Sequence, residues 1–480
     1  MRVPKRSIFY TTVLIVKTNT LYDIMNPWRD VQQRITILLI NNPLCSKFIR
    51  FIDDNPLYNG ALVLGSGAVL AQAIGVLSML VITRLYSPSD FGIYTLFSSF
   101  LAIVVGVASL RYEFAFPLIN DDKRAANLLA LCLIILIGTS AGFTFILLSA
   151  GVYLVNFFQM NSLAVFMWLL IVGFFGIGLY TILNYWAIRQ RDYTRITYTR
   201  INQSISGAGC KILLGAFSFG PIGLIIGNII GQMAGIGTFA RALWKTEQNI
   251  FKNITFAGIK SVAKEYWHFP AFNCPGLLIS TISLQIPPLI LVALYDTQIV
   301  GFFTLAQALL VFPTSIISAS VAQAFHGDIG MMVRQGSNEL KAFYIKTVKH
   351  LTLVALPLIG ISSLLAPFVV PIIFGDAWGD AGWYCLPLAL MVIPGFIAAT
   401  TNKLDVYGYN HWVLMINIIQ ILFVLCGFYL CNLLELPVLL TLTIYALIML
   451  SMYVAIIVLN LKAISNVTRS MRSHTDNFKH

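Results

Sequence analysis

The sequence predicts an all-α membrane protein with about twelve spanning helices in two related halves, and three observations support this. Of the 480 residues, 58% are hydrophobic and 10% are charged, whereas a soluble globular protein carries about 25% charged residues. Apolar runs of spanning length follow one another from residue 58 onward. A short motif also occurs twice, each time between two such runs. The core of a soluble protein of this length could not bury so many apolar residues.

The repeated motif divides the chain into halves. Both copies have the same internal spacing, and they lie close to half a chain apart. A fixed-offset repeat between hydrophobic runs indicates two related halves of a membrane protein. A chance match is the alternative, and the hydropathy pattern argues against it. The copies are Leu85-Tyr86, Gly92, Thr95-Leu96 and Leu294-Tyr295, Gly301, Thr304-Leu305.

Residues 1–57 differ from the rest of the chain because they are rich in basic residues. Their apolar run, Ile8 to Val16, is shorter than the roughly 20 residues that a spanning helix needs. We expect a cytosolic basic arm that lies partly on the membrane surface. Translation beginning near Met25 is the alternative.

Twelve spans follow the arm. Their expected boundaries are about 59–83, 91–111, 125–150, 163–187, 198–219, 221–243, 268–294, 298–325, 348–373, 383–404, 411–431 and 437–461.

The basic residues give the orientation. If the N-terminus is cytosolic, nearly all of the 31 Lys and Arg residues fall in the arm, the cytosolic loops and the tail. Arg84 is the one on the outer side, and Lys211 and Lys403 fall within spans. This asymmetry follows the positive-inside rule and places both termini in the cytosol. It also argues against a nucleic-acid partner, because no single domain collects the positive charge.

Six spans in each half mean that both halves enter the membrane in the same direction, as parallel repeats do. The expected parts are two six-helix bundles, a basic linker and a tail. Their ranges are 58–245 for the first bundle, 246–265 for the linker, 266–462 for the second bundle and 463–480 for the tail.

Three stretches carry a family resemblance. The run from Arg84 to Tyr94 (Arg-Leu-Tyr-Ser-Pro-Ser-Asp-Phe-Gly-Ile-Tyr), the run from Ser109 to Pro117 (Ser-Leu-Arg-Tyr-Glu-Phe-Ala-Phe-Pro), and Tyr185-Trp-Ala-Ile-Arg189 with its basic loop resemble the bacterial polysaccharide-biosynthesis flippases. These Wzx-type O-antigen translocases belong to the multidrug/oligosaccharidyl-lipid/polysaccharide exporter superfamily. The resemblance covers roughly residues 58–462.

The resemblance implies two six-helix bundles around a central cavity in the bacterial cytoplasmic (inner) membrane. It also implies alternating access that moves a polyprenyl-pyrophosphate-linked oligosaccharide from the cytosolic to the outer leaflet, for O-antigen, capsule or exopolysaccharide synthesis. The expected partners are this lipid-linked oligosaccharide, membrane lipids and other polysaccharide-assembly membrane proteins. We expect no catalytic residues and no cofactor. Whether a coupling ion drives transport, and whether it is H⁺ or Na⁺, is left open.

Lys211 is the sharpest single feature, because it falls near the middle of the fifth span. A lysine at mid-bilayer costs about 2.5–3.5 kcal/mol on insertion scales, so it should face protein or water. We expect a cavity cation that attracts the sugar pyrophosphate. The alternative is a snorkelling or purely structural lysine.

Arg111 and Glu113 end the second span and are expected at the inner mouth of the cavity. Residues two apart point to different helix faces, so we expect them not to pair with each other. Arg suits phosphate through its planar donor fork. Interface anchoring is the alternative for Arg111.

Three further polar residues are candidates for the substrate path. Arg84 either gates or receives the pyrophosphate at the outer mouth, or pairs with Asp90 in its own turn. Lys403 and Asp405 close the tenth span, where Asp405 is either a coupling-ion carboxylate or part of a polar cytosolic turn.

Glycine and proline patterns predict how the spans pack and bend. Glycines every four residues along the sixth span give a smooth face for close helix approach. Pro287 and Pro288 are expected to interrupt the seventh span and to act as a hinge. The glycines are Gly223, Gly227, Gly231 and Gly235.

The sequence shows no hydrolytic triad, phosphate-binding glycine loop or metal-ligand spacing. A cation-coupled multidrug exporter of the same superfamily is the nearest alternative, and it would need acidic residues deep in its spans. A membrane polysaccharide polymerase or glycosyltransferase is a second one, and it would need a large charged outer loop.

Overall fold

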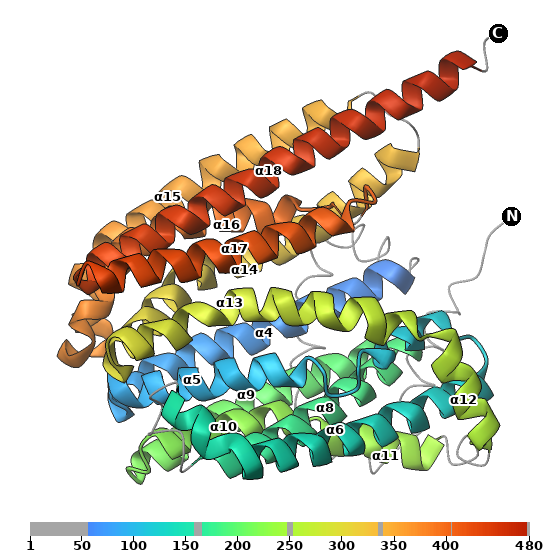
Figure 1. Ribbon diagram of the computed structural model, residues 1–480, viewed down its shortest axis with the longest axis horizontal. Coiled ribbons are helices and arrows are strands. Elements are labelled where there is room, and N and C mark those ends of the chain that lie inside the picture. Colours follow the sequence, from blue (N-terminus) through green and yellow to red (C-terminus); the bar gives the residue numbers. More distant parts are fainter. Residues whose placement is uncertain (1–55, 158–165, 247–252, 335–338, 405, 478–480) are drawn as a thin grey trace, which may run out of the picture. The chain divides into compact units, whose positions relative to one another are not determined.

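A computed structural model describes residues 56–157, 166–246, 253–334, 339–404 and 406–477. Every regular element in these ranges is a helix (Figure 1). The chain divides into two compact units, Met1–Val63 and Leu64–His480. Within the first unit the structure describes only the beginning of one helix, so the contacts below all belong to the second. The predicted arm therefore lies outside the described residues, except for its last two positions.

The first half of the chain contains the helices up to residue 246. They are α4 (Pro56–Leu85), α5 (Pro88–Val105), the short 3-10 helix η2 (Tyr112–Leu118), α6 (Asp122–Phe157), α8 (Met167–Arg189), α9 (Tyr193–Ala216), α10 (Pro221–Met233) and α11 (Ile236–Thr246).

The second half begins with a helix in the predicted linker. Its elements are α12 (Phe256–Glu265), the π-helix η4 (Phe269–Asn273), α13 (Cys274–Leu294), α14 (Thr297–Arg334), α15 (Leu340–Phe374), η5 (Asp376–Trp378), α16 (Gly379–Thr401), α17 (Asn410–Leu433) and α18 (Val438–Asn477).

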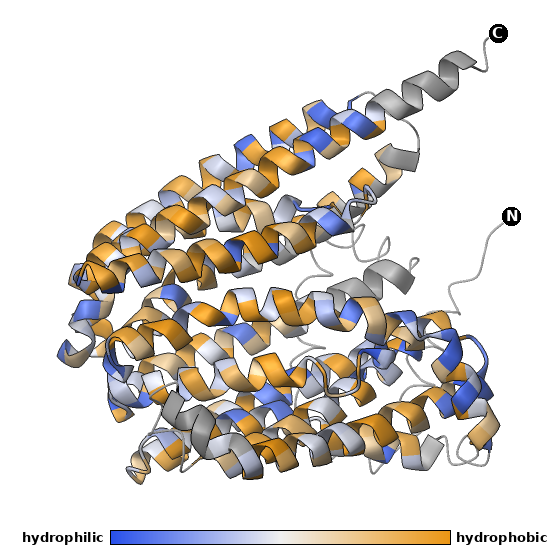
Figure 2. Cartoon of the chain, in the orientation of Figure 1, coloured by the Kyte–Doolittle hydropathy of each residue, from blue (hydrophilic) through white to orange (hydrophobic). Residues whose placement is uncertain are grey.

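Eleven segments of the described chain are long and apolar enough to cross a membrane. Apolar residues run along most of the length of these helices (Figure 2). The predicted fifth span, α9, is a 24-residue helix that is not among the eleven. It carries Arg195, Arg200 and Lys211, so its average hydropathy is low. The predicted fold class, an all-α polytopic membrane protein, is confirmed.

The repeat is visible in the helices themselves. Helix α4 ends at Leu85 and α13 at Leu294, and the next helices begin at Pro88 and Thr297. These equivalent positions are separated by the same 209 residues that separate Thr95 from Thr304. The motif tyrosines also correspond. Tyr86 donates to the carbonyl of Lys211 at 2.7 Å, and Tyr295 donates to the carbonyl of Leu436 at 2.9 Å.

The turn before α5 is fixed by its own sequence. Ser87 caps the helix by accepting from the backbone N–H of Asp90, and the Asp90 carboxylate accepts from the backbone N–H of Ser87. Pro88 occupies the first turn, where its missing N–H costs nothing. This capping box ends α4 and starts α5 within three residues, so the two helices turn sharply against each other.

The buried apolar residues form two main clusters. One is drawn from residues 96–269 and the other mainly from residues 291–449. Four residues of the first half, Ile82, Tyr86, Phe91 and Leu224, belong to the second cluster. The two halves therefore share packed apolar surface where α4, α5 and α10 contact the second half.

Some predicted boundaries were wrong. Helix α5 stops at Val105, and the chain turns through Leu110 and Arg111, which both have positive φ, into η2. The predicted sixth span, 221–243, agrees with the apolar segment Pro221–Trp244, but a short turn beside Gly235 divides it into α10 and α11. An added Cβ on Gly235 would meet Tyr180 and Thr199. Helix α18 continues to Asn477, so the predicted tail is largely helical.

The predicted linker, where it is described, packs against α6. An added Cβ on Gly258 of α12 would lie 2.6 Å from the Asn127 side chain, so a larger residue there would displace Asn127. The Asn127 amide oxygen accepts from the backbone N–H of Thr255, and Arg124 forms an ion pair with Glu265. This stretch is a folded element as well as a connection.

Candidate functional site

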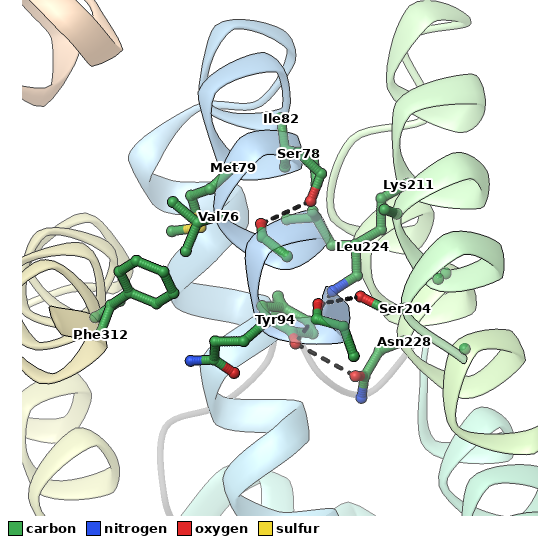
Figure 3. A pocket seen from close by; sticks show the side chains of 18 of the residues that line it. Val76, Ser78, Met79, Ile82, Tyr94, Ser204, Lys211, Leu224, Asn228 and Phe312 are labelled. Atoms are coloured by element: carbon green, nitrogen blue, oxygen red, sulfur yellow. Dashed lines mark hydrogen bonds between the residues drawn. The ribbon is translucent and has the colours of Figure 1, made fainter. Parts of the chain in front are cut away.

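A cavity of about 780 Å³ lies among α4, α5, α9, α10 and α14. Helices α9 and α10 give it a polar wall. Helices α4 and α14 give it a mostly apolar wall, which includes Val76, Met79 and Phe312 (Figure 3). It thus has an amphipathic lining, unlike the purely apolar surface of a lipid-filled gap.

One face of α9 forms the polar wall. Its lining residues recur every three or four positions, the spacing of a single helix face. From the first to the last, the face is about 16 Å long at 1.5 Å per residue. The residues are Arg200, Gln203, Ser204, Gly207, Ala208 and Lys211.

Glycines bring α9 and α10 close together behind this wall. An added Cβ on Gly231 would lie 2.9 Å from the Cα of Gly207, and one on Gly227 would lie 2.4 Å from the Lys211 side chain. An added Cβ on Gly223 would likewise lie 2.3 Å from the Tyr86 hydroxyl oxygen. Because side chains are absent at these points, the Lys211 stem can lie along α10.

Lys211 lies partly buried between Tyr94 and α10 (Figure 3). Its Nζ is 3.4 Å from the Tyr94 hydroxyl and 4.7 Å from the centroid of the same ring. Tyr94 donates to the Asn228 amide oxygen at 3.4 Å, and Gln232 donates to that oxygen at 3.3 Å. These partners are neutral, so they hold the ammonium group without cancelling its charge.

The charge of the lining is one-sided. Among the described residues, the cavity is lined by two charged side chains, Arg200 and Lys211, and by no carboxylate. Amide and hydroxyl groups supply most of the other polar atoms of the lining. They come from Gln72, Ser78, Tyr94, Gln203, Ser204, Asn228, Gln232 and Thr304. Such a lining suits an anion that carries hydroxyl groups.

Of the predicted path residues, the structure places Lys211 on the cavity lining. Arg84 does not pair with Asp90. Its guanidinium donates to the carbonyls of Ile372 and Ile373, at 2.9 and 3.0 Å. The physical reason is that the Asp90 carboxylate is already used in the cap of α5 by the Ser87 N–H and hydroxyl.

The prediction that Arg111 and Glu113 do not pair was wrong. Their side chains form an ion pair at 3.3 Å, and Ser109 donates to the other Glu113 oxygen at 2.5 Å. The prediction assumed an α-helix, whereas the left-handed conformation of Arg111 (φ 66°) lets both side chains point the same way. Both lie outside the cavity lining in the described chain.

The remaining predicted residues lie elsewhere. Lys403 follows α16, where its backbone N–H donates to Asn460, and Asp405 lies outside the described residues. Pro287 and Pro288 are buried inside α13, which continues through them, so they do not interrupt the helix. Their role as a hinge stays a prediction. Gly235 packs against Tyr180 and Thr199 rather than against the cavity.

Comparison with known proteins places the chain in a family. Residues 81–382 match the model of a family described as polysaccharide biosynthesis protein. The chain belongs to that polysaccharide biosynthesis family. The match runs from the end of α4 into α16, so it contains both copies of the repeated motif and the whole polar wall of the cavity.

The fold of this polysaccharide biosynthesis protein is similar to that of MATE transporters. An inward-facing multidrug resistance MATE family transporter of the MOP superfamily matches 83% of this chain and 96% of its own, with 15% identity and a TM-score of 0.65. A MATE protein in the bent conformation matches 87% and 97%, with 16% identity and a TM-score of 0.53. An outward-facing MATE family transporter matches 86% and 96%, with 15% identity and a TM-score of 0.51. None of the curated protein sequences matches this chain.

Sequence reasoning missed Arg200, Gln203 and Asn228 as cavity residues of this family member. The positive-inside count placed Arg200 with the cytosolic loop residues, although the expected fifth span, 198–219, includes it. The signal that could have found it was the three- and four-residue spacing of polar and small residues from Arg200 to Lys211. That spacing predicts one helix face, and Lys211 was already expected to face protein or water.

The buried ion pair gives a prediction about stability. Glu113 is 2% exposed and Arg111 is 17% exposed. Removing one partner of a buried pair leaves an unpaired charge and costs about 3–5 kcal/mol. We therefore expect Glu113→Ala to lower the melting temperature of the detergent-purified protein strongly, and Glu113→Gln to lower it less because it keeps a partner for Ser109. The matched control is Arg195→Ala, which breaks the partly exposed pair with Asp192 and should cost about 1 kcal/mol or less. Equal melting temperatures for Glu113→Ala and Arg195→Ala would contradict this account.

Proposed function

We propose that this chain is a flippase for a polyprenyl-diphosphate-linked oligosaccharide, which it carries from the cytosolic to the outer leaflet of the bacterial cytoplasmic membrane. The observation that carries the proposal is the lining of the cavity, with two cations, several amides and no carboxylate among the described residues. Family membership in polysaccharide biosynthesis and the transporter-like fold support it.

The physical problem for such a substrate is its head group. A diphosphate cannot cross hydrocarbon unpaired, because burying an ionised group in an apolar medium is prohibitive. Lys211 and Arg200 supply compensating charge at the two ends of one helix face. Between them, Gln203 and Ser204 of α9, with Asn228 and Gln232 of α10, present donors and acceptors to sugar hydroxyls.

The chemistry of the two walls assigns the parts of the substrate. The sugar and diphosphate occupy the polar side formed by α9 and α10. The prenyl chain stays on the apolar side, which is continuous with the exposed apolar surfaces of α4 and α14. In this scheme both termini are cytosolic, the linker and tail lie on the cytosolic side, and the two six-helix bundles move against each other.

A cation-coupled multidrug exporter is the second candidate, because the similar structures include a multidrug resistance transporter. A carrier of cationic drugs needs anionic groups in its cavity, and the described lining has none. The lining therefore favours the anionic substrate.

Extraction of lipid-linked glycans from cells with and without the gene tests the proposal. We expect complete oligosaccharide units to accumulate on the cytosolic side when the gene is deleted, because assembly continues while transfer stops. Accumulation of single units on the outer leaflet would instead indicate a polymerase. Unchanged lipid-linked glycans with greater sensitivity to toxic cations would indicate the drug exporter.

A further inference from the structure

One end of the cavity is closed by residues near the α4–α5 turn. Ile82, Phe91 and Phe374 line the cavity there and are buried. Behind them lies Trp378, which is 1% exposed, donates its indole N–H to the Thr83 carbonyl at 2.9 Å and contacts the Phe91 ring edge-on at 4.9 Å. The first half of the chain supplies Ile82, Thr83 and Phe91, and the second half supplies Phe374 and Trp378.

The two copies of the repeated motif meet at this same end. An added Cβ on Gly92 would lie 1.7 Å from the Thr297 carbonyl oxygen, and one on Gly301 would lie 1.9 Å from the Pro88 carbonyl oxygen. Pro88 and Thr297 are themselves equivalent positions of the repeat, so the contact is reciprocal. We call this contact between α5 and α14 the glycine crossing. The hydroxyls of Thr95 and Thr304 are 2.9 Å apart across it.

Arg84 contacts the end of α15 beside the crossing and has no counter-ion among the described residues. It donates to two carbonyls in the last turn of α15, at Ile372 and Ile373. Helix C-terminal carbonyls lack partners within their own helix and attract cations. No carboxylate in the described chain forms an ion pair with Arg84. The guanidinium therefore links α4 to α15 without a carboxylate that neutralises its charge.

We propose that Arg84 exchanges partners during transport. When this end of the cavity is closed, Arg84 binds the end of α15. When the glycine crossing opens, α15 moves away and the guanidinium binds the diphosphate of the departing substrate. The identity of the anion rests on the proposed function, whereas the closing contact does not. A guanidinium suits both roles, because its fork binds neutral carbonyls and binds phosphate in two-point fashion.

The first test measures how often this end opens. A cysteine replaces Thr95, which is partly buried and contacts Thr304 at the crossing, in a chain whose seven native cysteines are replaced. Labelling with a membrane-impermeant maleimide from the outside then reports the open state. Arg84→Gln removes the charge from these hydrogen bonds and should raise the labelling rate about tenfold or more. Arg84→Lys keeps the charge and should raise it less.

The matched control is Arg189→Gln. Arg189 also donates to backbone carbonyls, those of Ile119 and Asn120, and forms an ion pair with Asp122, but all of these belong to its own half of the chain. Its replacement should leave the labelling rate unchanged. If Arg84→Gln is labelled no faster than the parent, Arg84 does not hold this end closed.

The second test adds inorganic pyrophosphate outside, in a Lys211→Met background that removes the cavity lysine. A ligand that binds only the open state shifts the population toward it. Pyrophosphate should therefore raise the labelling rate when Arg84 is present and have no effect in Arg84→Gln. The same response with and without Arg84 would overturn the exchange of partners. Neither test uses a lipid-linked glycan. If both tests give the expected results but lipid-linked glycans are unchanged after gene deletion, the partner exchange of Arg84 stands and the flippase proposal is rejected.

Discussion

Replacing Lys211 with methionine is expected to slow transfer of the lipid-linked oligosaccharide about 10- to 100-fold while leaving membrane insertion intact. Methionine keeps an unbranched apolar side chain against Gly227 and removes only the charge. A hydrogen bond to a charged group is worth about 1.5–3 kcal/mol, and each 1.4 kcal/mol is about tenfold in rate. Lys211→Ala should be equally impaired. Lys211→Arg should retain more activity because it keeps the charge.

The control for this prediction is Lys264→Met, the same change on the exposed surface of α12, outside the cavity. Transfer is measured as the rate at which the glycan becomes accessible on the outer face, at equal protein levels. Full activity of Lys211→Met and of Lys211→Ala would show that Lys211 is a structural lysine, which was the alternative from the sequence.

Adding a single methyl group at the glycine crossing should have an effect of similar size. In Gly92→Ala the new Cβ would lie 1.7 Å from a backbone oxygen, so α5 and α14 must move apart. We expect this to keep one end of the cavity open, to lower transfer at least tenfold, and to speed labelling of the Thr95→Cys reporter. Because the contact is reciprocal, Gly301→Ala should behave in the same way.

Gly360→Ala, in α15, is the matched control for both glycines. Nothing lies within 4 Å of an added Cβ on Gly360, and Gly360 does not line the cavity. Alanine there should be tolerated, and it should stabilise the helix by about 0.5–1 kcal/mol relative to glycine. Transfer at the parental rate by either Gly92→Ala or Gly301→Ala would show that the crossing need not close during transport.

The features that could be predicted from the sequence are those set by local composition. Long apolar runs predicted the spanning helices, because a chain that crosses lipid must pair its backbone N–H and C=O groups within a helix. The repeat spacing gave two equivalent turns, and the helices indeed end at Leu85 and Leu294. A lysine inside a span indicated a polar environment, and Lys211 does line the cavity.

The features that escaped prediction depend on contacts between distant segments. The repeat showed that Gly92 and Gly301 are equivalent, but not that the two copies pack against each other. Arg84 binds carbonyls about 290 positions away, which no local pattern indicates. The Arg111–Glu113 pair was missed because one left-handed residue changes the direction of a side chain, and nothing in the sequence marked that position.

The central claim is that the chain moves a glycan head group across the membrane by means of its cationic cavity. The most direct measurement uses purified protein in vesicles that hold a polyprenyl-diphosphate-linked oligosaccharide in one leaflet. Appearance of the glycan in the other leaflet is followed with a lectin that cannot cross the membrane. The account predicts rapid transfer with the parent chain and little with Lys211→Met. Transfer no faster than in protein-free vesicles, or equal transfer by both chains, would contradict it.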